Sequence, residues 1–218
     1  MSPVAALPLD LPTWRGKLHV YAFATAVPAG TLLVLSASGT TATVAAVIYT
    51  FSLLALFGMS AAYHRLAHSV KARAVMRRFD HSMIYVLIAG TYTPVCLIAL
   101  PRAWGIPVLV VVWTGAVAGI LVKTIAFDRL PWRIAGNALY LVLGWVALAA
   151  IPVMVHSLTG AQLALIGAGG LLYTLGFPVL FLKRPDPWPK TFGYHEVWHA
   201  FTVAAGMCHF AAVALLVR

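Results

Sequence analysis

The sequence predicts an all-α integral membrane protein, a bundle of seven transmembrane helices with a cytoplasmic N-terminus and an outside C-terminus. Of the 218 residues, 62% are hydrophobic and 9% are charged, whereas a soluble globular domain carries roughly 25% charged residues. Seven apolar runs are each about 20 residues long, enough to cross a hydrocarbon core of roughly 30 Å. Lysine and arginine gather in alternate loops, as the positive-inside rule requires.

The predicted spans are separated by glycine, proline and short polar stretches. They cover residues 18–38, 43–64, 81–100, 105–126, 134–156, 162–182 and 195–217. Residues 1–17 are expected to form a cytoplasmic N-terminal segment, which is rich in proline and lacks the layout of a cleavable signal peptide. Residues 18–218 are expected to form one seven-span domain. Within it, the small-xxx-small pattern from Gly115 to Gly119 favours close packing of the fourth span.

The basic residues determine the predicted orientation. All except two fall on one side of the seven spans: Arg15, Lys17, Arg65, Lys71, Arg73, Arg77, Arg78, Lys123, Arg129, Arg133, Lys183, Arg184 and Lys190. The exceptions are Arg102 and Arg218. In a soluble protein the formal charge of +10 would suggest a nucleic-acid partner. Here we expect a cytoplasmic belt against anionic lipid headgroups instead, with membrane lipids as partners and no nucleic acid.

The stretch GYHEVWHAF, residues 193–201, contains the pattern H-E-x-x-H from His195 to His199. Two histidines four residues apart lie on one helix face, about 6 Å apart, so both imidazoles can bind one ion. In zinc proteases the glutamate of this pattern is the general base. Glu196, however, points about 100° around the helix from His195. We therefore favour an interfacial or supporting role for Glu196.

Four polar residues from three predicted spans share one depth, at the cytoplasmic end. His64 ends span 2, Asp80 opens span 3, and His195 and His199 lie in the first turns of span 7. Ionisable residues inside a membrane are costly and therefore point to function. Three histidines match a catalytic zinc site, which has three protein ligands and an open position for water. We predict zinc bound by His64, His195 and His199.

Two further residues are candidates for catalysis. Asp80 could hold the water or act as general base, and Ser60 lies one turn before His64 on the same face. Structural alternatives exist for both: Asp80 could cap the N-terminus of its helix, and Ser60 could be a small packing residue. Zinc lowers the pKa of its water to about 7, which suits hydrolysis at neutral pH. The same three histidines could also bind other metal ions that accept imidazole ligands.

The remaining histidines have weaker cases. His19 begins span 1 and is a candidate for a supporting contact, and His81 is expected to orient Asp80 or meet the interface. His209 lies about 15 Å deeper than His199, at 1.5 Å per residue, and is expected to pair with another buried polar group. His68 is expected to be solvated, and His156 lies at the opposite membrane face.

Three motifs together resemble the hemolysin III family, which belongs with the progestin and adipoQ receptors. They are SAAYH (residues 60–64), FDHSMIYVLIAGTYTP (79–94) and GYHEVWHAF (193–201). The resemblance implies zinc held by His64, His195 and His199, with Asp80 contacting the zinc-bound water and Ser60 close by. It also implies a cytoplasmic N-terminus and, with the bacterial members, a plasma-membrane location. The family's motif before span 1 is reduced here to WRGKLHVYAF, in which His19 alone matches.

The function classes that the resemblance implies differ. Some eukaryotic relatives are similar to ceramide-cleaving amidases, and bacterial members are linked to hemolysis and to membrane homeostasis. The site residues favour a zinc-dependent hydrolase of a lipid amide or ester that enters from the inner leaflet. The alternatives are a non-enzymatic membrane sensor or homeostasis protein with structural zinc, and a hemolysin-type cytolysin. An intramembrane protease is disfavoured because no Asp follows the H-E-x-x-H pattern.

Overall fold

The computed structural model describes residues 11–126 and 129–218, and within them it forms eight α-helices and one π-helical turn. Seven segments of these ranges are long and apolar enough to cross a membrane, which confirms the predicted all-α bundle of seven spans. The orientation of its termini stays a prediction. The elements are α1 (Lys17–Leu35), α2 (Thr40–Leu66), α3 (Val70–Pro94), the π-helix η1 (Val95–Ala99), α4 (Arg102–Ile125), α5 (Leu130–Gly144), α6 (Ala147–Ser157), α7 (Gly160–Leu182) and α8 (Tyr194–Leu216). The third span is α3 with η1, and the fifth is α5 with α6.

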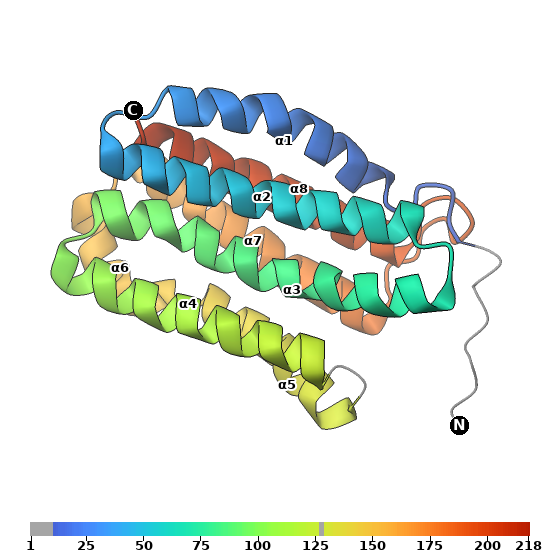
Figure 1. Cartoon of the computed structure of the whole chain (residues 1–218). Coiled ribbons are helices and arrows are strands. Elements are labelled where there is room, and N and C mark those ends of the chain that lie inside the picture. Colours follow the sequence, from blue (N-terminus) through green and yellow to red (C-terminus); the bar gives the residue numbers. More distant parts are fainter. Residues whose placement is uncertain (1–10, 127–128) are drawn as a thin grey trace.

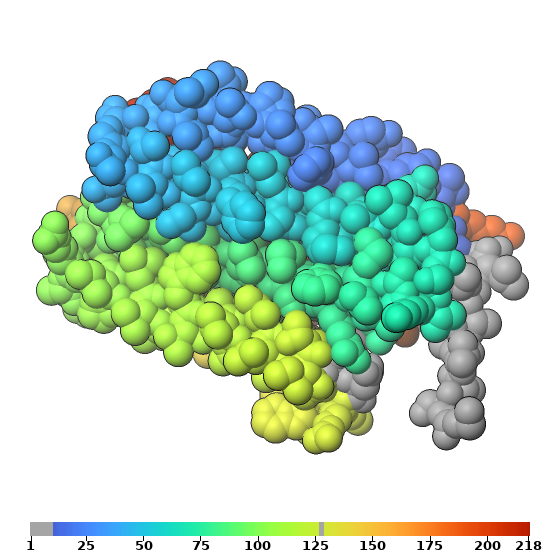
Figure 2. All heavy atoms as spheres, in the orientation of Figure 1, coloured from blue at the N-terminus to red at the C-terminus, as the bar shows by residue number. Residues whose placement is uncertain are grey.

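The helices pack largely in chain order. Each of α1, α2, α3 and α4 contacts the next, α6 contacts α7, α7 contacts α8, and α8 returns to α1. Figure 1 shows the long helices running side by side, and Figure 2 shows α1 to α4 succeeding one another across one face of the bundle. The last helix, α8, also contacts α2 and α3. It is therefore placed to bring the H-E-x-x-H pattern against residues of the second and third spans.

One end of the bundle is called the histidine end, after His64 and His195. Here α1 begins, α2 ends, α3 begins and α8 begins. Because successive spans run in alternate directions, every second connection lies at this end. Thirteen of the fifteen lysines and arginines lie in or beside these connections or before the first span. The C-terminus lies at the opposite end (Figure 1).

The third helix begins about ten residues earlier than predicted, at Val70 instead of residue 81. Its N-cap is Ser69, whose hydroxyl accepts a hydrogen bond from the Ala72 amide. The interpretation of Asp80 as a helix N-cap is therefore wrong, because Asp80 lies about three turns inside the helix. The basic stretch before it carries no helix breaker, so the helix continues beyond the apolar run that defined the predicted span.

The fifth span is broken in its middle, which its continuous apolar run did not indicate. The hydroxyl of Tyr92 lies in the gap, where it accepts a hydrogen bond from the Ala147 amide at 2.8 Å. It also lies 3.0 Å from the Leu143 carbonyl and 2.9 Å from the Gly144 carbonyl. A side chain inserted into the helical ladder, next to a glycine, is a known cause of a helix break. Tyr92 thus satisfies backbone groups that the break exposes inside the bundle.

The small-xxx-small pattern of α4 packs as predicted. A Cβ atom at Gly119 would collide with the Tyr85 ring, and one at Gly115 would collide with the Leu143 side chain. These glycines therefore let α4 approach α3 and α5 closely. Tyr85 in turn donates a hydrogen bond to the Gly136 carbonyl of α5, so these contacts join the three helices.

Candidate metal centre

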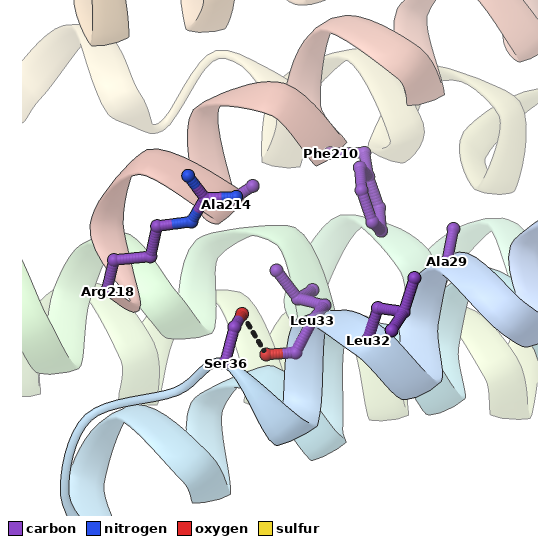
Figure 3. Close-up of a pocket in the computed structure, with 7 residues that line it drawn as sticks. All are labelled: Ala29, Leu32, Leu33, Ser36, Phe210, Ala214 and Arg218. Carbon is purple, nitrogen blue, oxygen red and sulfur yellow. Dashed lines mark hydrogen bonds between the residues drawn. The ribbon is translucent and has the colours of Figure 1, made fainter.

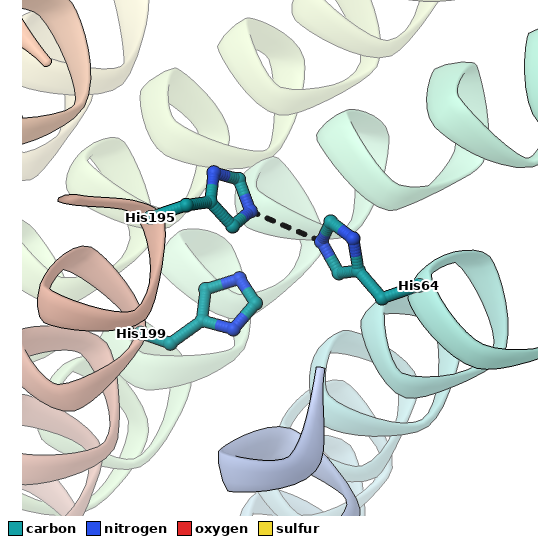
Figure 4. Close-up of side chains that lie close together, drawn as sticks. All are labelled: His64, His195 and His199. Carbon is teal, nitrogen blue, oxygen red and sulfur yellow. Dashed lines mark hydrogen bonds between the residues drawn. The ribbon is translucent and has the colours of Figure 1, made fainter. Parts of the chain in front are cut away.

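Three histidines converge at the histidine end from two helices. His64 lies in the last turn of α2, and His195 and His199 lie in the first two turns of α8. One ring nitrogen from each lies within 4.8 Å of those of the other two. Figure 4 shows the three rings facing a common space. Residues far apart in the sequence thus form a group that could hold a metal ion.

The separation of His64 and His195 suits two ligands of one tetrahedral ion. The Nε2 atoms of His64 and His195 lie 3.1 Å apart. Ligands at about 2.0–2.1 Å from a tetrahedral zinc lie roughly 3.3 Å from one another. The Nδ1 atom of His199 is buried and has no hydrogen-bond partner among the described residues. This nitrogen therefore lacks the outer hydrogen bond that usually fixes a metal-binding histidine.

Two carboxylates hold the start of α8. Glu196 is fully buried; one carboxylate oxygen accepts a hydrogen bond from the Gly193 amide at 2.9 Å, and the other pairs with Arg15 at 2.5 Å. Asp186 accepts a hydrogen bond from the Tyr194 amide. Both carboxylates satisfy free amides at the start of the helix. Both oxygens of Glu196 are therefore engaged, as expected for a supporting residue and not for a base.

The two predicted catalytic residues are neighbours in the structure. Ser60 is 2% exposed, and its side chain lies beside the Asp80 carboxylate. Asp80 also lies 3.6 Å from the Nδ1 atom of His81. Ser60 and Asp80 line the same cavity as His195 and His199. Helices α2, α3 and α8 thus bring together the residues selected from the sequence, and the roles of Asp80 and Ser60 stay predictions.

A cavity of about 920 Å³ extends from these polar residues into the bundle. Beyond them its walls are mainly apolar, and they include Leu87, Ile88, Val95, Leu163, Ile166 and Phe177. The walls come from α3, η1 and α7 as well as α8. Sites for small molecules are typically apolar clefts with a few convergent polar groups. In this cavity, Ser60, Asp80, His195 and His199 form such a group.

A second, smaller cavity of about 440 Å³ lies near the C-terminus. It is lined by Ala29, Leu32, Leu33, Ser36, Phe210, Ala214 and Arg218 (Figure 3). Ser36 already donates its hydroxyl hydrogen to the Leu33 carbonyl. This lining offers no group of metal-binding or acid–base side chains, so the larger cavity is the better candidate for chemistry.

The remaining histidines lie in different surroundings. The Nδ1 atom of His81 lies 2.8 Å from the Arg77 carbonyl and 3.6 Å from the Asp80 carboxylate. The orienting role of His81 stays a prediction. His209 lies 3.3 Å from the Ile166 carbonyl, and so has a buried polar neighbour as expected. His68 is exposed. His19 is buried and stacks on His199 with ring centroids 3.8 Å apart.

Two contacts of this centre were not predicted from the sequence. Arg15 was assigned only to the basic belt, yet it pairs with Glu196, and its distance of 181 residues along the chain left no local signal. His19 was named only as a candidate for a supporting contact and was not assigned to the site, although it was the one residue of its region that matched the family pattern. That match was the available signal for the contact with His199.

Comparison with known proteins agrees with the motifs. A family model described as "Haemolysin-III related" matches residues 9–210. Hemolysin-3 of Bacillus cereus is 36% identical over 190 residues, which cover 86% of this chain and 83% of that protein. The Hemolysin-3 homolog of Bacillus subtilis is 35% identical over 166 residues, or 76% of this chain and 74% of that protein.

A mammalian relative is more distant. The human monocyte to macrophage differentiation factor is 26% identical over 176 residues, which cover 76% of this chain and 67% of that protein. The bacterial identities and the extent of the family match decide the assignment, and the mammalian match agrees with it. The chain belongs to the hemolysin III family, within the progestin and adipoQ receptor superfamily.

Proposed function

We propose that this protein is a zinc-binding membrane protein with a hydrolase-like centre that acts on a lipid amide or ester. One observation carries the proposal: of three converging imidazoles, those of His195 and His199 line a large cavity together with Asp80. The other walls of this cavity are mainly apolar. A cavity of that size and lining suits an acyl chain, and its polar end suits the bond that joins the chain to a headgroup.

Zinc is the ion that best suits the ligand set. Three neutral imidazoles with no carboxylate or thiolate in the group match the three-histidine sites of hydrolytic zinc proteins. When bound in such a site, zinc lowers the pKa of its water to about 7 and so provides a nucleophile at neutral pH. The proximity of His64 and His195 supports one shared ion.

Asp80 and Ser60 supply the remaining chemistry in this proposal. The Asp80 carboxylate would hold the attacking water, take its proton, and pass that proton to the leaving amine or alcohol. The Ser60 hydroxyl, which lies beside Asp80, would keep the carboxylate turned toward the cavity. Glu196 takes no part, because Arg15 and the Gly193 amide already engage it.

We further propose that the histidine end faces the cytoplasm of a bacterial cell. The positive-inside rule supports this, since thirteen of the fifteen basic residues belong to that end. The same orientation would place the cavity's polar end near the inner leaflet, from which a lipid substrate would enter. The protein would then be a resident of the plasma membrane, as the Bacillus relatives suggest.

The test is acyl-chain release by the purified protein. Detergent-purified protein, loaded with zinc, is incubated with a panel of N-acyl and O-acyl lipids, and free fatty acid is measured by mass spectrometry. We expect release that is lost after a zinc chelator and restored by added zinc. An Asp80→Asn variant is the matched control, since it keeps the three histidines. Zinc binding without any release would instead favour the non-enzymatic alternative.

That alternative is a membrane sensor or homeostasis protein with structural zinc. It is favoured by one observation, namely that the three-histidine group ties the end of α2 to the start of α8. The cytolysin alternative rests only on the names of the Bacillus relatives. Lysis of erythrocytes by purified protein, independent of Asp80, would support the cytolysin alternative over the hydrolase.

A further inference from the structure

The segment that leads into α1 wraps around the outside of the metal centre. The amides of Thr13 and Trp14 donate hydrogen bonds to the carbonyls of Lys190 and Thr191, just before α8. Arg15 then pairs with Glu196. Three consecutive positions of the segment thus contact α8 or the residues just before it, and α8 carries two of the three histidines. The next position, Gly16, faces the third histidine.

Gly16 makes the closest approach. It has a φ of +77°, a conformation that favours glycine, and a Cβ atom there would lie 2.6 Å from the His64 Cβ. Only a residue without a side chain therefore allows the turn to pass over His64. This turn sets the entry of α1 and directs its first helical face toward α8.

His19 lies on that face and touches a predicted metal ligand directly. It is 3% exposed, and its ring stacks on the His199 ring with centroids 3.8 Å apart and planes 11° apart. Phe57 of α2 also lies against His19, with centroids 5.1 Å apart. The His199 ring is thus backed by a flat surface that is itself wedged between helices.

A short hydrogen-bond chain anchors His19. The Thr202 hydroxyl lies 2.8 Å from the His199 carbonyl, to which it donates. The same oxygen lies 3.0 Å from His19 Nε2 and forms a hydrogen bond with it. His19 is therefore anchored to the same turn of α8 whose side chain it stacks on.

His199 lacks the support that metal-binding histidines usually have. Such a histidine normally donates its second ring N–H to a carboxylate, a carbonyl or a water, and this bond fixes the ring. The Nδ1 atom of His199 is buried without a hydrogen-bond partner among the described residues. The stacked ring of His19 occupies the position from which the orientation of His199 can be controlled instead.

We propose that His19 is a positioning residue of the metal centre, which holds the His199 ring in its metal-binding orientation by stacking on it and by bonding to Thr202. This inference rests on the proposed zinc site. It assigns the start of α1 to the centre, in addition to α2, α3 and α8.

The experiment measures metal binding, not catalysis. Zinc affinity is determined by chelator competition, and the visible absorption of the Co²⁺-substituted protein reports the ligand geometry. The variants are His19→Ala, His19→Phe, Thr202→Val and Thr202→Ser, with His156→Ala as a control because that exposed histidine lies at the opposite end. Loss of an outer contact of this kind typically costs about 10- to 100-fold in metal affinity.

We expect His19→Ala to weaken zinc binding by about that factor and to shift the cobalt bands. His19→Phe keeps the stacked ring but loses the hydrogen bond to Thr202, so its zinc affinity should fall less than that of His19→Ala. Thr202→Val loses the same hydrogen bond and should lose the same amount of affinity as His19→Phe. Thr202→Ser keeps the hydroxyl and should bind zinc as tightly as the wild type. Wild-type affinity and cobalt spectra in both His19→Ala and Thr202→Val would overturn the proposal. If His19→Ala does not fold, the zinc affinities and cobalt spectra of His19→Phe, Thr202→Val and Thr202→Ser test the proposal instead. Wild-type protein that binds neither ion would overturn the zinc site itself, and this inference with it.

Discussion

The Nε2 atoms of His64 and His195 lie 3.1 Å apart, although 131 residues separate them in the sequence. Two neutral imidazole nitrogens repel each other through their lone pairs unless a proton or a cation lies between them. The backbone of α2 and α8 holds them at this separation, with His199 one turn further along α8. This separation suits an N–H···N hydrogen bond between the two rings, and it equally suits one cation held by both, which is the arrangement we propose.

The first prediction concerns metal content. Purified wild-type protein should contain one zinc per chain by mass spectrometry, and the double variant His195→Ala/His199→Ala should contain almost none, because one imidazole cannot retain the ion. His156→Ala, which removes a histidine at the opposite end, should keep wild-type content. Metal-free wild-type protein that is well folded would make the three histidines a polar cluster without a ligand.

Removal of His64 should abolish the stabilisation of the protein by added zinc. Zinc that binds only the folded protein stabilises it by about 2.7 kcal/mol at one hundred times its Kd. We expect added zinc to raise the unfolding temperature of the wild type and to leave that of His64→Ala almost unchanged, because the tie between α2 and α8 is lost. Thermal unfolding followed by tryptophan fluorescence measures both. An equal zinc response in the two proteins would exclude His64 as a ligand.

Substitution of Asp80 should separate binding from catalysis. Asp80→Asn keeps the size of the side chain and all three histidines, so zinc content should stay near one per chain. If Asp80 transfers the proton, acyl release should fall by about 10²- to 10⁴-fold. Ser60→Ala should have a smaller effect, because the carboxylate remains. Loss of zinc in Asp80→Asn would show that Asp80 is a ligand or a structural residue instead.

The pair of Arg15 and Glu196 should matter for stability more than for zinc chemistry. Glu196 is fully buried, so Arg15→Met leaves its charge without a partner, which costs up to about 3–5 kcal/mol in buried pairs. Since the Arg15 side chain is 15% exposed, we expect a value at the lower end. The double variant Arg15→Met/Glu196→Gln should recover part of the loss, as the effects of contacting residues are not additive. Chemical unfolding of the wild type, the two single variants and the double variant gives the coupling.

A catalytic role for Glu196 would have a different signature. Glu196→Gln can still accept the hydrogen bond from the Gly193 amide, so α8 should keep its start. Zinc content and acyl release of the folded variant should then stay within a few-fold of the wild type. Abolished release with intact zinc and stability would identify Glu196 as a base, as in the zinc proteases.

The orientation can be tested by cysteine labelling in intact bacterial cells. Cys96 and Cys208 are free and are first replaced by alanine. Single cysteines are then introduced by Lys190→Cys, at the histidine end, and Ser38→Cys, in the exposed connection between α1 and α2 at the other end. A membrane-impermeant maleimide should label only the Ser38→Cys protein. Labelling of Lys190→Cys alone would reverse the proposed orientation.

Much of this protein can be predicted from its sequence because the membrane restricts the choices. Backbone groups must be satisfied within each span, so an apolar run of about 20 residues can only be a helix. Charge asymmetry and the rarity of intramembrane polar residues then selected His64, Asp80, His195 and His199 without coordinates. The spacing of His195 and His199 is local, and it already implied a shared face.

Only the tertiary structure decided the contacts that lie outside such local rules. The helix of Asp80 extends about ten residues beyond its apolar run, and the fifth span breaks where Tyr92 enters from another helix. Arg15, Gly16 and His19 reach the metal centre because a turn before α1 folds over the ends of α2 and α8. Periodicity and hydropathy describe one segment at a time, whereas these contacts depend on how the side chains of different segments fill the same space.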